Sequence, residues 1–371
     1  MRILLLADPV SAHTIKWANG LYSKGLEISI FGLSSYDSTQ YNPNIKIDTF
    51  TFPKFIKLRT DGSILKVLYL MALPRLRKKI NNYKPDIIHA HSASSYGLLG
   101  ALSGFHPFAL SVWGTDIYNF PQKSRLLKQV VVYNLKKADM LFSTSRIMAE
   151  ETKKYTTKKV NVIPFGINTE TFKPTGFKKY FSRDDIVIGT VKSIEKKYGT
   201  EYLVTAFKKI KEKYPNLPLK LLIVGGGSMI GSIKKMVVNL GIESDVQLTG
   251  FVSYDKIPDY HRMLDIYVAV STEDSESFGV AILEASACEN PVIVSNVGGL
   301  PEVVEDNTTG FVIPKSNVEV LVEKIELLLD EELRKKFGKA GRIRVKNLFN
   351  WDENVNQMIR NYQKIINPSV N

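Results

Sequence analysis

Cysteine and long apolar runs are nearly absent from the sequence, and both absences narrow the class of protein. One residue of 371 is a cysteine, Cys288, so an internal disulfide is excluded and a reducing compartment is expected. No apolar run reaches the roughly 18 residues that a membrane-spanning helix needs. The first residues, Met1–Leu6, lack the long apolar core and cleavage site of a secretory signal. We expect a cytoplasmic protein.

Histidine is also scarce, which bears on metal binding. The chain has five histidines, and His89 and His91 are the pair closest together in sequence. Both would lie on one side of a strand end, but a zinc site needs a third ligand, and the spacing of the other histidines does not offer one. No metal site is predicted.

The length and the order of apolar segments predict two α/β domains. A chain of 371 residues, 44% of them apolar, exceeds the usual size of one core. Short apolar strands alternate with helical stretches, which is typical of parallel sheets. Strands are predicted at Ile3–Ala7, Ile28–Phe31, Ile45–Phe52, Asp86–Ala90, Phe108–Trp113, Met140–Thr144, Val160–Ile163, Ile186–Val191, Leu219–Val224, Val246–Leu248, Ile266–Val270 and Val292–Ser295. Helices are predicted at Thr14–Ser23, Ile64–Ile80 with a kink at Pro74, Thr200–Lys213, Ile230–Leu240, Tyr254–Met263 and over most of Asn317–Ile366.

The segment from Pro164 to Pro174 begins and ends with proline and contains Gly166, which marks a boundary between the domains. We predict an N-terminal domain over 1–165, a linker over 166–183, a second domain over 184–350 and a final helix over 351–371. The net positive charge of the chain comes entirely from the first half. Residues 1–177 hold 24 Lys and Arg against 11 Asp and Glu, whereas the rest hold 26 of each. This asymmetry indicates an anionic partner for the first half, and an anionic membrane surface fits better than nucleic acid because no nucleic-acid-binding motif is present.

The stretch from Glu276 to Glu284 has the clearest chemical pattern. Its two carboxylates stand eight residues apart, and Ser277 is a candidate N-cap for the apolar helix that follows. Backbone N–H groups at a helix N-terminus attract anions, phosphates above all. On one helix the two carboxylates would lie roughly 12 Å apart, on either side of that anion site. Glu276 would then contact a sugar, and Glu284 a ribose.

This pattern resembles the signature of retaining family-4 glycosyltransferases (glycosyl transferases group 1). The resemblance continues through Val297-Gly298-Gly299-Leu300-Pro301 and includes Pro164-Phe165-Gly166-Ile167-Asn168, the family's interdomain segment with two replacements. It implies the GT-B fold, an α/β architecture with two doubly wound Rossmann-like domains facing across a cleft, and a last helix from Trp351 that crosses back onto the first domain. It also implies that Ser277, Phe278, Gly279 and Val280 contact the donor.

The phosphates of a nucleotide sugar need cations, and here the chain departs from the family. Most members have Arg and Lys five residues apart, where an ungapped alignment places Ser193 and Tyr198. A shift of one residue restores a pair at the same spacing, Lys192 and Lys197, and we prefer it because some cation must neutralise the leaving group when no metal does. A solvated basic loop is the alternative.

Two glycine-containing turns are predicted to contact the nucleotide. Gly225 and Gly227 follow a strand and precede a helix, but they lack the spacing of a dinucleotide fingerprint, so NAD is not expected. Gly250 and Phe251 resemble the segment that contacts the base, with core packing as the alternative for Phe251. No cofactor is predicted, and the donor would be a UDP-sugar or a GDP-sugar.

The first domain is expected to hold the acceptor. His91 would hydrogen-bond the acceptor in the cleft. The alternative is a structural histidine with its hydrogen bonds satisfied, and for His89 this alternative is favoured at least as much. Trp113 stands where similar enzymes often carry histidine, and Asp116 is assigned to the transferred sugar, with helix capping as its alternative. Ser11 and His13, in a first loop without the paired glycines of many relatives, complete the acceptor side.

Together these features predict metal-independent, retaining transfer of a hexosyl or N-acetylhexosaminyl group to a glycan or lipid-linked acceptor in cell-envelope polysaccharide, lipopolysaccharide or capsule assembly. The protein would be peripheral on the inner face of the membrane. The alternatives are a sugar-nucleotide epimerase of the same fold and a sugar-nucleotide-binding protein without turnover. A metal-dependent GT-A transferase is disfavoured, because Glu273-Asp274-Ser275-Glu276 opens directly into the helix.

Overall fold

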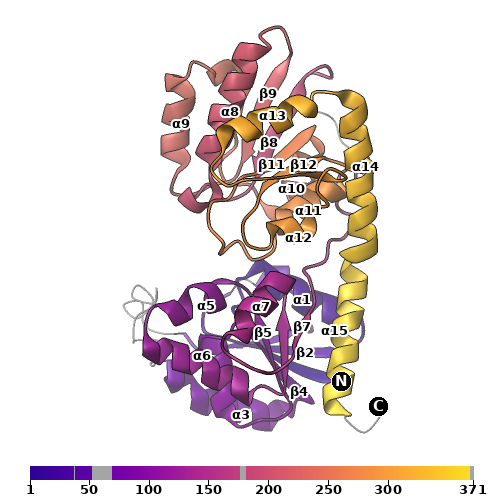
Figure 1. Cartoon of the computed structure of the whole chain (residues 1–371). Helices are drawn as coiled ribbons and strands as arrows, with labels where there is room; N and C mark the ends of the chain where they lie inside the picture. The colour runs from indigo at the N-terminus through magenta and orange to yellow at the C-terminus, as the bar shows by residue number, and fades with distance from the viewer. Residues whose placement is uncertain (37, 52–68, 176–180, 368–371) are drawn as a thin grey trace. The chain divides into compact units, whose positions relative to one another are not determined.

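The computed structural model describes residues 1–36, 38–51, 69–175 and 181–367, which form two compact units (Figure 1). The first unit comprises Met1–Pro164 with Asp352–Asn371, and the second comprises Phe165–Trp351. Each unit is built around its own parallel sheet. The chain therefore has the two-domain α/β organisation that the alternation of strands and helices indicates.

Seven parallel strands of the described residues form the sheet of the first unit, in the order β3-β2-β1-β4-β5-β6-β7. Their bounds are β1 Arg2–Leu6, β2 Glu27–Gly32, β3 Lys46–Thr49, β4 Ile87–His91, β5 Phe108–Val112, β6 Met140–Ser143 and β7 Val160–Val162. The helices of this unit are α1 Ala12–Ser23, α3 Leu73–Tyr83, α4 Ser95–Ser103, α5 Thr115–Tyr118, α6 Arg125–Lys137, α7 Arg146–Lys153 and α15 Trp351–Ile366.

Side-chain alternation along the strands fills both faces of this sheet. Ile88 and Ala90 of β4 belong to a core that includes residues of α3, α4 and α6. His89, on the opposite face, meets Tyr362 of α15. The C-terminal helix thus contacts one face of the first sheet at His89, although it follows the second unit in sequence.

The second sheet has the same winding, with six parallel strands of the described residues in the order β10-β9-β8-β11-β12-β13. The strands are β8 Ile186–Val191, β9 Leu219–Val224, β10 Val246–Leu248, β11 Ile266–Ala269, β12 Val292–Ser295 and β13 Gly310–Ile313. The helices are α8 Thr200–Lys213, α9 Ile230–Asn239, α10 Ile257–Arg262, α11 Val280–Ala287, α12 Leu300–Val303, α13 Val318–Leu327 and α14 Glu331–Leu348. In both sheets the strand order reverses beside the first strand, between β1 and β4 and between β8 and β11. Ligands of doubly wound sheets bind at such a reversal, outside the carboxyl ends of the strands.

The start of α11 corrects one expectation. Ser277 is not its N-cap, because the helix begins at Val280 after Gly279, whose φ is +95°. A side chain at Gly279 would lie 2.8 Å from Ile282 Cδ1, so the chain turns into the helix where glycine permits it. Glu276 therefore lies in the loop before the helix, and the 12 Å separation expected for two carboxylates on one helix does not apply.

Further differences concern the ends of elements. Pro74 occupies the first turn of α3 and does not kink it, since a helix tolerates proline at this position. The predicted helix Ile64–Ile80 begins with residues 64–68, which lie outside the described residues. Phe52, the last residue of the predicted strand Ile45–Phe52, also lies outside them. The predicted helix Tyr254–Met263 is a 3₁₀ turn, Tyr254–Lys256, followed by α10. Strand β13 was not predicted, and neither were the helices α4, α5, α6, α7 and α12.

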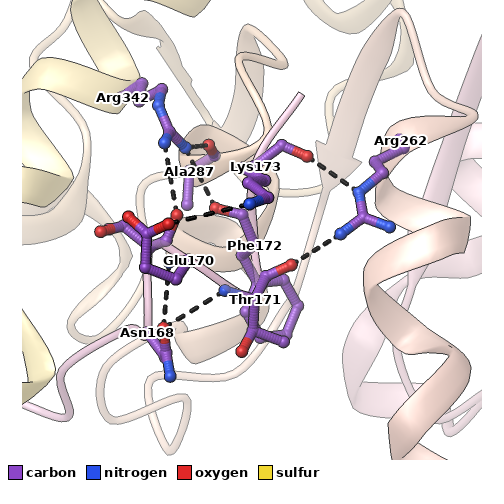
Figure 2. Close-up of polar contacts among 9 residues, drawn as sticks. Asn168, Glu170, Thr171, Phe172, Lys173, Arg262, Ala287 and Arg342 are labelled. Carbon is purple, nitrogen blue, oxygen red and sulfur yellow. Dashed lines mark hydrogen bonds and ion pairs between the residues drawn. The ribbon is translucent and has the colours of Figure 1, made fainter. Parts of the chain in front are cut away.

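Most of the described part of the predicted linker is fixed to the second unit. Figure 2 shows Arg342 of α14 donating from Nη1 to the carbonyls of Ala287 and Phe172, the latter at 3.0 Å. Arg262 donates to the carbonyls of Thr171 at 2.7 Å and Lys173 at 2.8 Å. Because these bonds satisfy the backbone of an irregular segment, the chain after Phe165 belongs to the second unit.

Candidate functional site

An ion pair stands at the strand-order reversal of the second sheet. Lys192 directly follows β8, and Glu276 lies in the loop after β11. Lys192 Nζ is 2.8 Å from Glu276 Oε1, with side chains 25% and 11% exposed. The sheet topology thus brings together two residues that are 84 positions apart in sequence.

A tyrosine joins the two predicted cations. Lys192 Nζ lies 4.5 Å and Lys197 Nζ 4.9 Å from the centroid of the Tyr198 ring. Both distances are within the range of a cation–π interaction. Burial lowers the pKa of Lys192, but the attraction of Glu276 and Tyr198 outweighs it and raises the pKa overall. Lys192 is therefore charged at neutral pH. The two lysines therefore lie at one aromatic ring, and their assignment to the phosphates stays a prediction.

The glycines after β9 are required because two loops approach each other closely. The N–H of Ile194 donates to Gly226 O at 2.8 Å, which holds the loop after β8 against the loop after β9. Gly225 has φ +139°, and a side chain there would lie 2.1 Å from Lys192 O. A side chain at Gly227 would lie 2.3 Å from Ile194 O. These glycines position the backbone that carries Lys192.

The next turn leaves an aromatic side chain uncovered. Gly250 has φ +71°, and its carbonyl accepts from Gly225 N–H at 3.1 Å. Phe251, which follows, is 86% exposed. Core packing, the alternative considered for Phe251, is therefore wrong, and its ring is available to a flat partner.

The loop that carries Glu276 is held from behind by a second glycine pair. Gly299 N–H donates to Glu276 O at 2.8 Å. A side chain at Gly298 would lie 2.1 Å from Glu276 O, and one at Gly299 would lie 2.2 Å from Ser277 O. The sequence Val297-Gly298-Gly299 therefore supports the Glu276 loop through its backbone.

Of the remaining residues of the central motif, Phe278 packs in the core and Val280 begins helix α11. Phe278 is buried, with its ring 6.1 Å from that of Phe165 and 5.9 Å from that of Phe349, so it packs inside the second unit and is not open to a donor. Val280 begins α11, where the first backbone N–H groups have no partner within the helix. Such N–H groups are suited to phosphate.

Glu284, inside α11, is buried and shared between two neighbours. Its Oε1 accepts from the Tyr254 hydroxyl at 3.2 Å, and its Oε2 is 3.5 Å from His261 Nε2. Tyr254 is itself 55% exposed, so the buried carboxylate of Glu284 is hydrogen-bonded to a residue at the surface.

The first unit has a pocket of about 610 Å³ at its own strand-order reversal. The lining comes from the loops after β1, β4 and β5 together with the segment before α6. The lining residues are Asp8, Ser11, His91, Ser92, Ser94, Ser95, Tyr96, Trp113, Thr115, Asp116, Asn119, Phe120 and Lys123. Of the site residues predicted in the first unit, Ser11, His91 and Asp116 line it, and the ring centroid of His13 lies 5.8 Å from that of Trp113, which also lines it.

The two neighbouring histidines have different roles in the structure. His89 is fully buried, with Nδ1 2.6 Å from the Tyr362 hydroxyl and Nε2 2.7 Å from Ser111 Oγ. Burial lowers the pKa of His89 to about 3, so this is a neutral, satisfied, structural histidine. His91 lines the pocket, and its Nδ1 has no hydrogen-bond partner among the described residues. Burial, then His89 and His13, lower the pKa of His91 well below its usual value.

Asp116 is occupied by backbone groups. Its Oδ2 accepts from Ala93 N–H at 2.6 Å, and its Oδ1 accepts from Trp113 N–H at 3.1 Å and Gly114 N–H at 2.9 Å. Burial raises the pKa of Asp116, and these backbone donors oppose the rise. In this structure the carboxyl of Asp116 connects the loop after β4 to the loop after β5. This structural role resembles the capping role that was its alternative.

Sequence reasoning missed three residues that the geometry brings to these sites. Tyr198 lies between the predicted cations, and Tyr254 contacts Glu284. Ser92 has φ +113°, a conformation that costs a non-glycine residue about 1–3 kcal/mol and clusters at functional sites. The one feature of the sequence that could have pointed to Ser92 is its position directly after His91. Among the described residues, no group of three or more His, Cys, Asp or Glu is placed to hold a metal ion, and no helix of the described chain is long and apolar enough to cross a membrane.

Comparison with known proteins gives matches along nearly the whole chain. Residues 172–344 match the family model described as glycosyl transferases group 1, and residues 2–145 match glycosyl transferase 4-like. The capsular polysaccharide biosynthesis glycosyltransferase CapM of Staphylococcus aureus is 30% identical over 361 residues, 90% of each chain. A GDP-mannose-dependent alpha-(1-6)-phosphatidylinositol monomannoside mannosyltransferase of Mycobacterium tuberculosis is 31% identical over 202 residues, 51% of this chain. That match spans about half (52%) of the mycobacterial protein.

Solved structures extend the likeness to the fold. A glycosyltransferase from Rickettsia africae has a TM-score of 0.81 at 22% identity, over 99% of both chains. Anabaena Alr3699/HepE, solved in complex with UDP, has a TM-score of 0.79 at 18% identity, over 98% of this chain and all of the other. With two Rossmann-like units, both family models and a full-length relative in agreement, the chain belongs to the group 1, family-4-like glycosyltransferases and has the GT-B fold.

Proposed function

We propose that this glycosyltransferase moves a hexosyl or N-acetylhexosaminyl group, with retention of configuration, from a UDP-sugar or GDP-sugar to a glycan or lipid-linked acceptor. The process it serves would be assembly of cell-envelope polysaccharide, lipopolysaccharide or capsule. The names of the relatives support this range, since one acts in capsule synthesis and another is a GDP-mannose-dependent mannosyltransferase. UDP in the HepE structure supports a nucleoside diphosphate as part of the donor.

The observation that carries the proposal is the meeting of Lys192 and Lys197 at Tyr198, beside Glu276. When the glycosidic bond of a nucleotide sugar breaks, negative charge develops on the diphosphate, and cations fixed nearby stabilise it. Two lysines supply that charge without a metal ion or a cofactor. Lysine is a point charge and cannot form the paired hydrogen bonds of arginine, so we expect a looser hold on the diphosphate than an arginine would give.

The other residues of the second unit have places in the same proposal. Glu276 would orient sugar hydroxyls and stabilise the positive charge that develops on the transferred sugar, because a carboxylate accepts hydrogen bonds at both oxygens. Glu284 would contact the ribose beside Tyr254. Phe251 would lie against the base, and the N–H groups at the start of α11 would face the diphosphate. The acceptor hydroxyl would attack from the leaving-group side and pass its proton to a diphosphate oxygen.

The first unit would supply the acceptor site and the approach to the membrane. Its pocket is lined by Ser11 and His91, which were expected to contact the acceptor, and by Asp116, which was expected to contact the transferred sugar. The excess of positive charge in residues 1–177 would draw this unit to the anionic inner face of the cell membrane, where each Lys or Arg near the surface contributes about 1 kcal/mol.

The direct test is replacement of Lys197. We expect Lys197→Ala to lower the release of nucleoside diphosphate from the productive donor at least about tenfold, because the departing charge loses one of its two cations. Lys196→Ala is the matched control, since Lys196 is the exposed neighbour and should leave the rate unchanged. Equal rates for wild type and Lys197→Ala would remove Lys197 from the site. A changed sugar formed from donor alone would instead indicate an epimerase, and donor binding without released nucleoside diphosphate would indicate a binding protein.

A further inference from the structure

The pocket of the first unit has an aromatic wall. The Trp113 ring centroid lies 4.3 Å from that of His91, with the two planes tilted by 37°. His13 meets the same indole edge-on. Trp113 lines the pocket and is half-buried, so part of its surface borders the cavity. The face of such a ring is apolar and flat.

The other walls carry uncharged hydrogen-bonding groups. They belong to Ser11, Ser92, Ser94, Ser95, Thr115 and Asn119, and the hydroxyls of Ser92 and Ser94 bond to each other at 2.8 Å. Each hydroxyl both donates and accepts, and the amide has separate donor and acceptor ends. A pocket with one apolar wall and many neutral polar groups suits a ligand with one apolar face and a rim of hydroxyls.

The charge of the pocket disfavours an anion. Among the described residues that line it, Lys123 is the one lysine or arginine, and it is exposed. Asp8 and Asp116 contribute two carboxyl groups. Because burial keeps the His91 imidazole neutral, that residue adds no positive charge. A free phosphate or a small carboxylate would meet little compensating charge here.

We infer that this pocket binds an uncharged pyranose ring of the acceptor, with one face of the sugar stacked on Trp113 and its hydroxyls bonded to the surrounding serines. A pyranose presents C–H groups on its face and hydroxyls at its edge, which matches the two kinds of wall. This inference rests on the proposed function and narrows it: the acceptor ends in a neutral sugar, and Trp113 determines the specificity for it.

The test uses the full chain and the fluorescence of its tryptophans, of which there are three. The probes are the methyl α-glycosides of glucose, galactose, mannose and N-acetylglucosamine, with L-malate and inorganic phosphate as anionic comparisons. At least one glycoside should give a saturable change in emission. The change should vanish in Trp113→Phe, which has no indole in the pocket, and persist in Trp351→Phe, which keeps it.

Affinity measured by ligand-observed saturation-transfer NMR separates stacking from mere proximity. Trp113→Phe retains a flat ring and should bind the glycoside within a few-fold of wild type, whereas Trp113→Ala should bind it about tenfold more weakly. Unfolding midpoints of the two variants identify any loss that follows from misfolding, and Trp113→Phe keeps the test valid if Trp113→Ala is unstable. Absence of binding by all four glycosides, a Trp113-dependent response to malate or phosphate, or unchanged affinity in Trp113→Ala would each overturn the inference.

A wrong assignment of the pyranose pocket can be distinguished from a wrong assignment of the nucleotide-sugar donor. Stabilisation of the protein by UDP or GDP in a thermal-shift assay depends on the second unit, and Trp113→Ala should retain it. If nucleotide binding holds and glycoside binding fails, the acceptor assignment alone is wrong. If neither nucleotide stabilises the wild-type protein, the donor side of the proposed function is wrong.

Discussion

At the scale of single residues, Glu276 is the group on which the proposed chemistry most depends. Its carboxylate is paired with Lys192 at 2.8 Å, and its carbonyl is fixed by Gly299 N–H at the same distance. The side chain of Glu276 is thus held by Lys192 and its backbone by Gly299. In the proposed chemistry it would orient sugar hydroxyls and stabilise developing positive charge without itself becoming bonded to the sugar.

Replacing Glu276 by glutamine keeps its shape and removes its charge. We expect Glu276→Gln to lower transfer about ten- to hundredfold, because a hydrogen bond to a charged group contributes about 1.5–3 kcal/mol. The measurement is the rate of nucleoside diphosphate release at saturating donor. Glu273→Gln, at an exposed carboxylate of the same loop, should behave like wild type. Full activity in Glu276→Gln would end the assignment.

The glycines beside Lys192 give a prediction about stability. Gly225→Ala should lower the free energy of unfolding by about 1–3 kcal/mol or more, because the added Cβ would lie 2.1 Å from Lys192 O on a backbone of φ +139°. Gly231→Ala in α9 is the control. A Cβ there meets nothing within 4 Å, so stability should stay level or rise by up to about 1 kcal/mol. Urea unfolding compares the two, and equal midpoints would refute the close-approach argument.

At the scale of elements, α15 is joined to the first sheet by buried polar groups. Tyr362 donates to or accepts from His89 Nδ1 at 2.6 Å, and Asn354 Nδ2 donates to Pro164 O at 2.7 Å. The hydrophobic residues Val355 and Met358 of the same helix are buried. The last helix is thus an integral part of the first unit.

Tyr362→Phe tests this attachment. The substitution keeps the ring and leaves His89 Nδ1 without a partner in a fully buried site, which should cost about 1–3 kcal/mol of unfolding free energy. Tyr133→Phe on α6 removes a hydroxyl from a half-buried position and should cost much less. Thermal unfolding of the two variants decides between them. If Tyr362→Phe is no less stable than Tyr133→Phe, the hydrogen bond to His89 contributes nothing.

Several elements with a strong apolar period were predicted from the sequence, whereas helix α6 and the elements set by backbone geometry were not. The strands Ile186–Val191 and Leu219–Val224 and the helix Thr200–Lys213 have the bounds that their apolar pattern indicates. Strand β13 begins at Gly310 within a polar context and gives little pattern. The start of α11 depends on the φ of Gly279, which no composition rule reveals.

The candidate site was predictable to a similar depth. Its motif residues stood out by spacing, whereas the pairing of Lys192 with Glu276 was not predicted. Contacts across loops were beyond reach, because they depend on which side chains meet in three dimensions. The position of Tyr198 between two lysines and the burial of Phe278 between aromatic rings are of this kind.

At the scale of the whole molecule, charge distinguishes the two halves of the chain. Residues 1–177 have a net charge of +13, the difference between 24 basic and 11 acidic residues, and the remainder is neutral. Within the first unit, α3 exposes Arg77 and Lys78. Exposed like charges on one unit produce a field that anionic surfaces attract and that salt screens.

Sedimentation with lipid vesicles measures this attraction. We expect binding to vesicles rich in phosphatidylserine at low salt, little binding to neutral phosphatidylcholine vesicles, and loss of binding as salt is raised. Reversing both charges on α3, Arg77→Glu with Lys78→Glu, should weaken binding. Lys234→Glu with Lys235→Glu, an exposed pair on α9 of the second unit, should not. Equal losses in the two double variants would contradict a role for the first unit in particular.

The central claim is that a nucleoside diphosphate lies beside Lys192 and Lys197 at the carboxyl ends of β8 and β11. Calorimetric titration of UDP and GDP into wild type, Lys197→Ala and Lys196→Ala measures this most directly. We expect that at least one nucleotide binds wild type and Lys196→Ala alike, and that Lys197→Ala binds it about tenfold more weakly, a loss of about 1.4 kcal/mol. Identical affinities for all three proteins, or no binding of either nucleotide, would contradict it.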